Sequence, residues 1–210
     1  ITRSQLGSQY SYEVLVEYQE EDALKNPDVL KNMDEMAARI GTLSSTKVSN
    51  GKPRVSSVTK VVKEMNRTLN GDDPEAYVIP DDQDLVSQEM FLYEISGGSD
   101  LYDYVSEDFK AGYLHIELNG YDGEEIVRNL EEVKKWCKEL FPDASNAGVV
   151  GEVVQYAQMN GKLVRGSIKS IGTSLLVILI LLILAFTSLR TGFIAMIPNV
   201  VPIVIIGGIM

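Results

Sequence analysis

The sequence predicts an α+β domain followed by a pair of transmembrane helices. Over roughly the first 160 residues, segments that alternate apolar and polar side chains are interleaved with segments whose apolar residues recur at helical spacing. Beyond that point, two runs of 20 uncharged residues, 170–189 and 191–210, lie on either side of Arg190. We therefore expect one domain in residues 1–160 and a membrane hairpin in residues 161–210.

The charge of the chain is unevenly distributed. The whole sequence has 19 basic and 30 acidic residues, a net charge of −11. Since the residues from Gly161 onward include four basic residues and no acidic one, residues 1–160 carry a local net charge of −15. Phosphate binding needs clustered Lys and Arg, so this balance argues against a nucleic-acid partner. The single cysteine, Cys137, excludes an internal disulfide.

The α+β domain begins with one strand and one helix. Residues 12–18 (YEVLVEY) alternate in the manner of a half-buried strand. Apolar residues then recur at helical spacing between Leu30 and Ile40. Asn26, which precedes a proline, is the expected N-cap of this helix, and Gly41 is the expected C-cap.

The rest of this domain contains a helical insertion and a second set of strands and helices. The turn-rich stretch SNGKPR (49–54) joins short extended pieces, and two further helices form an insertion at about 57–96. Alternation returns at 110–120, and Asp122 then caps a long helix before a last strand in NAGVVGEVV (146–154). Without the insertion, this order is the βαββαβ pattern of a ferredoxin-like fold.

The first uncharged run has the length and composition of a transmembrane helix, which we expect at about 167–189. At about 1.5 Å per residue, such a helix spans the roughly 30 Å of the hydrocarbon core. A buried central helix of a soluble protein is the alternative. Soluble helices of this length keep a polar face, however, and residues 175–186 have none.

The second run, an expected helix at about 192–210, contains two prolines. Pro198 and Pro202 are four residues apart, so they lie on the same helix face, and each removes a backbone donor. In a bilayer such breaks persist where neighbouring helices satisfy the backbone. We therefore interpret Pro198, Asn199 and Pro202 as a helix-packing element, with a tolerated kink as the alternative. Because no polar flank closes this run, we expect a truncated helix and a longer protein.

The sequence contains no arrangement of residues typical of an active site. His115 is the only histidine and has no Cys or His partner, which argues against zinc binding and against Ser–His or Cys–His catalysis. The acidic cluster between Asp72 and Asp84 lacks the spacing of a calcium-binding loop, and turn or cap roles explain most of its members. We therefore expect no metal site, no cofactor and no enzymatic activity.

Several stretches together resemble one family of transporters. They are VLVEYQEEDALKNPDVLKNMDEM (14–36), SVTKVVKEMNRTLNGDDPEAYVIPDDQDLVSQEMFLYEISGG (57–98), GEVVQYAQMNGKLVRGSIKSI (151–171) and LLILAFTSLRTGFIAMIPNVVPIVIIGGIM (181–210). In this order they are similar to resistance–nodulation–division (RND) superfamily transporters, in the hydrophobe-exporter branch that includes the MmpL proteins. The IPNxxP element is the most distinctive part of the resemblance, which extends over nearly the whole chain.

The resemblance implies a topology. Residues 1–160 would form a porter domain in the periplasm or outside the cell, most similar to the second of two repeats, and the loop near Arg190 would be cytoplasmic. Counting positive charges alone, with Lys162, Arg165 and Lys169 on the domain side, would place the domain in the cytoplasm. The family topology takes precedence, because this count samples a single hairpin of a multi-pass protein in the inner membrane.

The resemblance also implies a proton-driven exporter of hydrophobic or amphiphilic, lipid-like molecules. Its partners would be membrane lipid, the substrate, and the rest of the transporter with a repeat-related porter domain; a homo-oligomer is one further arrangement. The family couples transport to acidic residues in a later transmembrane helix. Since neither uncharged run contains an acidic residue, we expect that proton relay elsewhere in the transporter.

At the junction between domain and membrane, we predict that three residues line the substrate path: Tyr156, Met159 and Asn160. Simple packing at the root of the helix is the alternative for each of them. Two other functions of the protein stay open. A membrane-tethered sensing or binding module, of a sterol-sensing-like kind, would share this architecture without transport. A membrane-anchored hydrolase is disfavoured by the missing nucleophile–base set.

Overall fold

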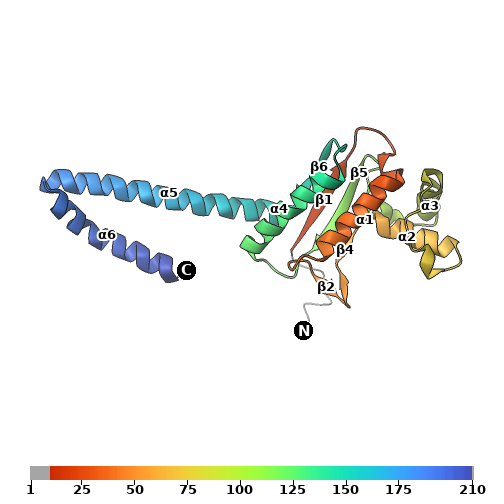
Figure 1. The fold of residues 1–210 in the computed structure, drawn as a ribbon, viewed down its shortest axis with the longest axis horizontal. Helices are drawn as coiled ribbons and strands as arrows, with labels where there is room; N and C mark the ends of the chain where they lie inside the picture. The colour runs from red at the N-terminus through yellow and green to blue at the C-terminus, as the bar shows by residue number, and fades with distance from the viewer. Residues whose placement is uncertain (1–9, 210) are drawn as a thin grey trace. The chain divides into compact units, whose positions relative to one another are not determined.

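The structure, a computed structural model, describes residues 10–209 (Figure 1). Within its last two helices, the side chains at the following positions are not described: 157–158, 160–165, 203–204 and 206–209. The chain divides into two compact units, Ile1–Gln158 and Met159–Met210. The first unit mixes helices with a sheet and the second is helical.

A four-stranded antiparallel sheet forms the centre of the first unit. The spatial order of its strands is β4-β5-β1-β6, and their bounds are Ser11–Glu17 for β1, Val55–Ser56 for β4, Ala111–Glu117 for β5 and Asn146–Val150 for β6. Val14 on β1 lies opposite Leu114 on β5 and Val149 on β6. Because side chains alternate between the two faces, the buried residues of these strands share one face. The predicted mixed α+β fold is confirmed at this level.

Two helices lie side by side against the sheet, α1 (Pro27–Gly41) and α4 (Gly123–Leu140) (Figure 1). Their apolar stripes are buried in the same hydrophobic core as the inward residues of β1 and β5. Arg39 of α1 also binds Glu139 of α4 at 2.9 Å. The core therefore lies between one layer of helices and one face of the sheet.

Side-chain caps fix where α1 and α4 begin. The side chain of Asn26 accepts a hydrogen bond from the backbone N–H of Asp28 at 2.9 Å. The side chain of Asp122 accepts from the N–H groups of Glu124 and Glu125 at 3.0 and 3.1 Å. These bonds satisfy N–H groups that have no partner inside a helix. Both predicted N-caps are confirmed.

The prediction that Gly41 is a C-cap is wrong. Gly41 is the last helical residue of α1, and Thr42, with φ of −86°, is the C-cap. A Cβ atom at position 41 would lie 2.9 Å from the side chain of Pro53. Pro53 belongs to the small hairpin of β2 (Val48–Ser49) and β3 (Lys52–Pro53), which forms from the turn-rich stretch. Glycine is needed here for close packing rather than for its backbone freedom.

A helical insertion lies between β4 and β5. Its two α-helices are α2 (Val58–Leu69) and α3 (Gln83–Ile95). A short 3-10 helix follows each of them, η2 (Pro74–Ala76) after α2 and η3 (Ser99–Asp103) after α3. The side chain of Asp82 caps α3 by accepting from a backbone N–H at 2.8 Å. α2 and α3 pack against each other, and their inward residues join the core of the sheet unit.

The last strand is shorter than predicted. β6 ends at Val150, and the long helix α5 (Glu152–Phe186) starts two residues later, so Val153 and Val154 are buried residues of a helix rather than of a strand. The reason is the single residue Gly151, whose φ of +124° turns the chain out of the sheet.

The second unit contains the rest of α5 and the helix α6 (Leu189–Ile209). Within the described residues, one segment, Gly166–Phe186, is long and apolar enough to cross a membrane. Thr187, with φ of +48°, turns the chain after Phe186. The turn therefore lies a few residues earlier than the sequence predicts, and α6 starts at Leu189 instead of 192.

Close packing holds the start of α6 against the end of α5. A Cβ atom on Gly192 would lie 2.6 Å from the side chain of Ile183 and 3.1 Å from its Cα. Further along α6, the backbone stays helical through Pro198 and Pro202 up to Ile209. Together these features describe a hairpin of two apolar helices.

Candidate functional site

A groove at the start of α5 is lined by four tyrosines and five other residues. Its volume is about 480 Å³, and all its lining residues belong to the first unit: Tyr10, Ser11, Tyr12, Glu13, Tyr121, Gly151, Glu152, Val153 and Tyr156. They come from the beginning of β1, the loop before α4 and the first turns of α5. The groove therefore joins three segments that are far apart in the sequence.

Backbone contacts bring the three segments together. The N–H of Leu118 at the end of β5 donates to the carbonyl of Tyr10 at 3.0 Å. On the other side, a Cβ atom on Gly151 would lie 3.3 Å from the Cα of Tyr12. Since the φ of +124° at Gly151 is also unfavourable for other residues, only glycine lets α5 start so close to β1.

Aromatic rings form the walls of the groove. The rings of Tyr10 and Tyr121 lie 5.6 Å apart between centroids, with an angle of 46° between their planes. Tyr156 is 54% exposed and presents its ring from the second turn of α5. A tyrosine ring has an apolar body and one polar tip, so such walls suit molecules that are partly apolar and partly polar.

The floor of the groove is set by Tyr12. Its side chain is only 3% exposed, and within residues 10–209 its buried hydroxyl has no hydrogen-bond partner. Burial, and to a smaller extent the nearby thiol of Cys137, raise the pKa of Tyr12. Tyr12 therefore stays neutral and belongs to the core, whereas Tyr121 and Tyr156 are exposed and Tyr10 is partly buried against the core.

The charge of the groove is acidic. Glu13 and Glu152 line it, and none of the lining residues is Lys or Arg. Glu13 also binds His115, with 2.9 Å between Oε1 and Nδ1. Acidic and aromatic groups without a basic one disfavour an anionic ligand and favour a neutral or cationic amphiphile.

The comparison with known proteins decides the family. The model of one protein family, the MMPL family, matches residues 29–209, which include most of the α+β unit and both long helices. The chain belongs to the MMPL family. The resemblance to RND-superfamily transporters that the sequence predicts is thereby confirmed. None of the curated protein sequences matches the chain. MMPL proteins are membrane transporters and generally not enzymes, and the candidate membrane segment Gly166–Phe186 agrees with this class.

The three residues predicted for the substrate path of this MMPL-family chain do not all lie in the groove. Tyr156 lines the groove. Met159 is 49% exposed but belongs to the second unit, outside the lining set. The side chain of Asn160 lies outside the described part of the chain. Pro198 and Asn199 are exposed residues of α6. The structure therefore places Tyr10 and Tyr121 beside Tyr156 in one groove, and all the predicted roles remain untested.

A second, larger groove at the opposite end of β1 is polar. Its volume is about 580 Å³, and its lining includes three carboxylates, three amides, one serine and five apolar or aromatic side chains: Tyr18, Gln19, Glu20, Ala23, Asn26, Asp28, Val29, Asn32, Leu140, Pro142, Asp143 and Ser145. Two of the amides serve the fold, because Asn26 caps α1 and Asn32 donates to the carbonyl of Leu140 at 2.9 Å. We therefore assign this groove no ligand.

The acidic cluster of the insertion consists of caps and ion pairs. Asp73 caps η2, and Asp82 caps α3. Asp81 binds Lys31, which lowers the pKa of Asp81 through their hydrogen bond. Within the described residues, no group of three or more His, Cys, Asp or Glu side chains is placed to hold a metal ion.

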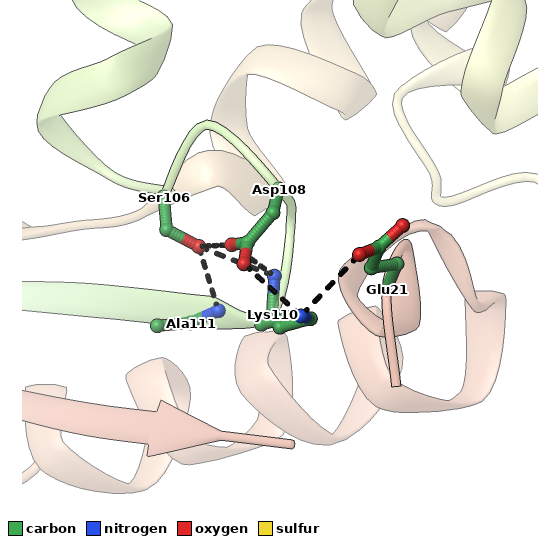
Figure 2. A network of polar contacts seen from close by, with 5 residues as sticks. All are labelled: Glu21, Ser106, Asp108, Lys110 and Ala111. Carbon is green, nitrogen blue, oxygen red and sulfur yellow. Dashed lines mark hydrogen bonds and ion pairs between the residues drawn. The ribbon is translucent and has the colours of Figure 1, made fainter. Parts of the chain in front are cut away.

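Figure 2 shows a further polar network, in the turn before β5. The hydroxyl of Ser106 accepts from the N–H of Ala111 at 2.9 Å and donates to Asp108 at 2.7 Å, which lowers the pKa of Asp108. Lys110 lies between Asp108 and Glu21, at 3.4 and 3.5 Å. This network fixes the turn before β5 and connects it to Glu21 in the segment after β1.

Proposed function

We propose that this chain supplies a porter domain and two transmembrane helices to an RND-type, proton-driven exporter of hydrophobic or amphiphilic, lipid-like molecules. The observation that carries the proposal is the MMPL family match over residues 29–209, which runs through the α+β unit and the helix pair alike. A soluble binding protein with a chance resemblance would match in the first unit only.

The fold supports the assignment as a porter domain. Antiparallel strands in the order β4-β5-β1-β6, with α1 after β1 and α4 after β5, correspond to the βαββαβ arrangement of a ferredoxin-like domain. The helices α2 and α3 then form an insertion between its second and third strands. In this proposal residues 1–160 lie in the periplasm or outside the cell, and the turn near Arg190 faces the cytoplasm.

The tyrosine-lined groove supports an amphiphilic substrate. The aromatic walls from Tyr10, Tyr121 and Tyr156 offer apolar surface, and Glu13 and Glu152 offer acceptors for a polar or cationic head. The path would continue along α5 past Met159 and Asn160 toward the bilayer. Groups of this kind bind a hydrophobic tail and a head group together better than they bind a fully polar solute.

The helix pair supports a role in packing rather than in proton transfer. Residues 170–189 and 191–210 contain no acidic residue, and Pro198, Asn199 and Pro202 would shape contacts with neighbouring helices. The proton relay and a repeat-related porter domain would come from the rest of the transporter. Membrane lipid would be the remaining partner.

An export assay tests the proposal. Cells that carry the complete transporter are loaded with a fluorescent, zwitterionic lysophospholipid, and its release is followed with and without a protonophore. We expect release that stops when the proton gradient collapses and that falls several-fold in a Tyr121→Ala, Tyr156→Ala double variant. Binding of the lipid without any gradient-dependent release would instead support a sensing module and overturn the export function.

Labelling tests the topology. In a Cys137→Ala background, the exposed Glu75 of the insertion is replaced by cysteine and treated with a membrane-impermeant maleimide in intact cells. An extracytoplasmic domain predicts labelling before lysis. Labelling only after lysis would place residues 1–160 in the cytoplasm.

A further inference from the structure

A carboxyl group in the helical insertion is buried without a hydrogen-bond partner. Glu89, on the inward side of α3, is 0% exposed, and within residues 10–209 neither of its oxygens has a partner. Val86 and Met90, on the same side of the helix, belong to the hydrophobic core. A charged carboxylate is unfavourable in such surroundings, so burial raises the pKa of Glu89 from 4.5 to about 7.

The elements around α3 place no cation beside Glu89 in the described part of the chain. α3 packs against α2, η3 and the short helix η1 (Ala23–Lys25). The titratable groups of these elements are bound to other residues or exposed: Lys25 to Asp22, Lys63 to Asp34, Arg67 through Nη2 to Glu64, Asp100 to Tyr93, Tyr102 to Glu94, with Lys60 and Asp103 exposed. The Nε of Arg67 is buried without a hydrogen-bond partner within residues 10–209. Burial alone raises the pKa of Glu89, and no charged neighbour contributes. The protonated form of Glu89 is therefore favoured in this position.

A second titratable group holds the far end of the insertion to the sheet. His115 on β5 lies with Nε2 2.7 Å from the carbonyl oxygen of Asp103 and with Nδ1 2.9 Å from Oε1 of Glu13. The ring of Tyr104 packs edge-on against the imidazole, with 5.4 Å between centroids. One side chain thus contacts the last residue of η3 and a strand of the sheet at the same time.

Both hydrogen-bond partners of this imidazole are acceptors. A neutral imidazole has one N–H and donates to one of them, whereas the imidazolium donates to both. The other neighbours do not replace that second donor, because Glu117 is bound to Lys47 and Ser56, opposite His115 on β4, is uncharged. The contact geometry therefore matches the protonated ring.

We propose that the helical insertion, residues 57–104, is a proton-dependent module that docks on the sheet at acidic pH and loosens as the pH rises. Glu89 lies within the insertion on α3, whereas His115 lies on β5 and holds the end of the insertion at Asp103, and protonation favours docking through each of them. At Glu89 it removes a buried charge, and at His115 it supplies the second donor. The observations on the two residues are independent of each other.

The direction of the pH effect follows for each group. When α3 is released, Glu89 titrates near its ordinary value of 4.5, whereas in the docked state it titrates near 7. Docking therefore weakens as the pH rises from about 4.5 to about 7 and changes little above that range, by at most about 300-fold in the opening equilibrium constant. For His115, the two acceptors are both satisfied only by the imidazolium, so protonation of the ring acts in the same direction.

Hydrogen–deuterium exchange on the complete chain in phosphatidylcholine nanodiscs tests the proposal. Protection factors, corrected for the intrinsic exchange rate, are measured for peptides of α3, η3, β1 and α4 at several pH values from 5 to 8. We expect the protection of α3 and η3 to fall by about 10- to 100-fold across this range. The peptides of β1 and α4 should stay within about 3-fold.

Substitutions test whether Glu89 and His115 are the groups that make the protection depend on pH. In Glu89→Gln, or in Glu89→Met if the amide is not tolerated, α3 should lose its pH dependence and keep its acid-form protection at pH 8. In His115→Gln, η3 should be poorly protected already at pH 5. Glu75→Gln is the matched control, because it removes an exposed carboxylate of the same insertion, and it should behave as the original chain.

Three results would overturn the proposal. The first is protection of α3 that does not change between pH 5 and 8. The second is a pH dependence of α3 protection that is as large in both Glu89 variants as in the original chain. The third is a parallel loss of protection in β1 and α4, since the pH would then act on the whole domain instead of on the insertion.

Discussion

The imidazole of His115 and the carboxylate of Glu13 lie 2.9 Å apart, and this contact joins the tyrosine-lined groove to the helical insertion. Glu13 lines the groove, while the other ring nitrogen of His115 binds the carbonyl of Asp103 at the end of η3. A change at either place therefore reaches the other through two hydrogen bonds. This connection runs across the face of the sheet that α1 and α4 do not cover.

Glu13→Gln should weaken this connection. The substitution replaces the carboxylate that lies 2.9 Å from Nδ1 of His115 by an uncharged amide. Both side chains are more than a third exposed, so solvent screening limits the loss to about 0.5 kcal/mol. Urea denaturation measures the loss beside that of Glu75→Gln, which removes an exposed carboxylate of the insertion. A loss no larger than in this control would contradict the role of the contact.

Tyr156→Ala should weaken the binding of amphiphiles to the groove. The substitution removes an exposed aromatic wall, which we expect to lower the affinity for a zwitterionic lysophospholipid about 5- to 10-fold without changing the melting temperature. Tyr156→Phe keeps the ring and should retain most of the affinity. Fluorescence titration of the chain in nanodiscs measures both variants. If the Ala variant binds as well as the original chain, Tyr156 only packs at the root of α5.

Gly151→Ala should destabilise the first unit. The φ of +124° at Gly151 is unfavourable for alanine, and its Cβ would lie 3.3 Å from the backbone of Tyr12. We expect a loss of about 1–3 kcal/mol in the free energy of unfolding. Gly148→Ala on the neighbouring strand is the control, because a Cβ atom there meets nothing within 4 Å. Equal effects of the two substitutions in thermal denaturation would show that Gly151 has no special role.

The sequence predicts the elements of the fold better than it predicts their contacts. The alternation around Val14 and Leu114 and the caps Asn26 and Asp122 depend on residues close in the chain, and the structure bears them out. The prediction that Gly41 is a C-cap is wrong because glycine is needed at this position for close packing against a residue distant in the sequence, Pro53. Local patterns report local backbone geometry, and long-range packing overrides them at such positions.

The same limit applies inside the insertion and at the candidate site. On α2 the apolar Leu69 is 52% exposed, whereas the polar Asn66 is buried, with its amide bound to the carbonyls of Ala76 and Val78. Tyr156 was predicted from its place at the start of the membrane helix. Tyr10 and Tyr121 could not be predicted as groove residues from the sequence, because only the pairing of strands brings them together.

Cys137 should be almost unreactive in the folded chain. Its thiol is fully buried, and burial raises the pKa of Cys137 from 9.0 to about 11. At pH 8 the thiolate, which is the reactive form, is therefore scarce as well as inaccessible. We expect iodoacetamide to react at least about 100-fold more slowly than with a free thiol, and at the free rate in denaturing urea. A cysteine at the exposed position 75, in a Cys137→Ala background, is the reactive control.

The hairpin of α5 and α6 should open when Gly192 is enlarged. A leucine at this position would enter the space of Ile183, both its side chain and its backbone. Overpacking of this kind commonly costs about 1–3 kcal/mol and moves the helices apart. Spin labels at positions 180 and 195 in a Cys137→Ala background report the change, since Gly192→Leu should lengthen and broaden the distance distribution between them. Gly172→Leu, at a position of α5 where a Cβ atom meets nothing within 4 Å, should leave the distribution unchanged. Unchanged distances in both variants would mean that the close contact at Gly192 does not hold the helices together.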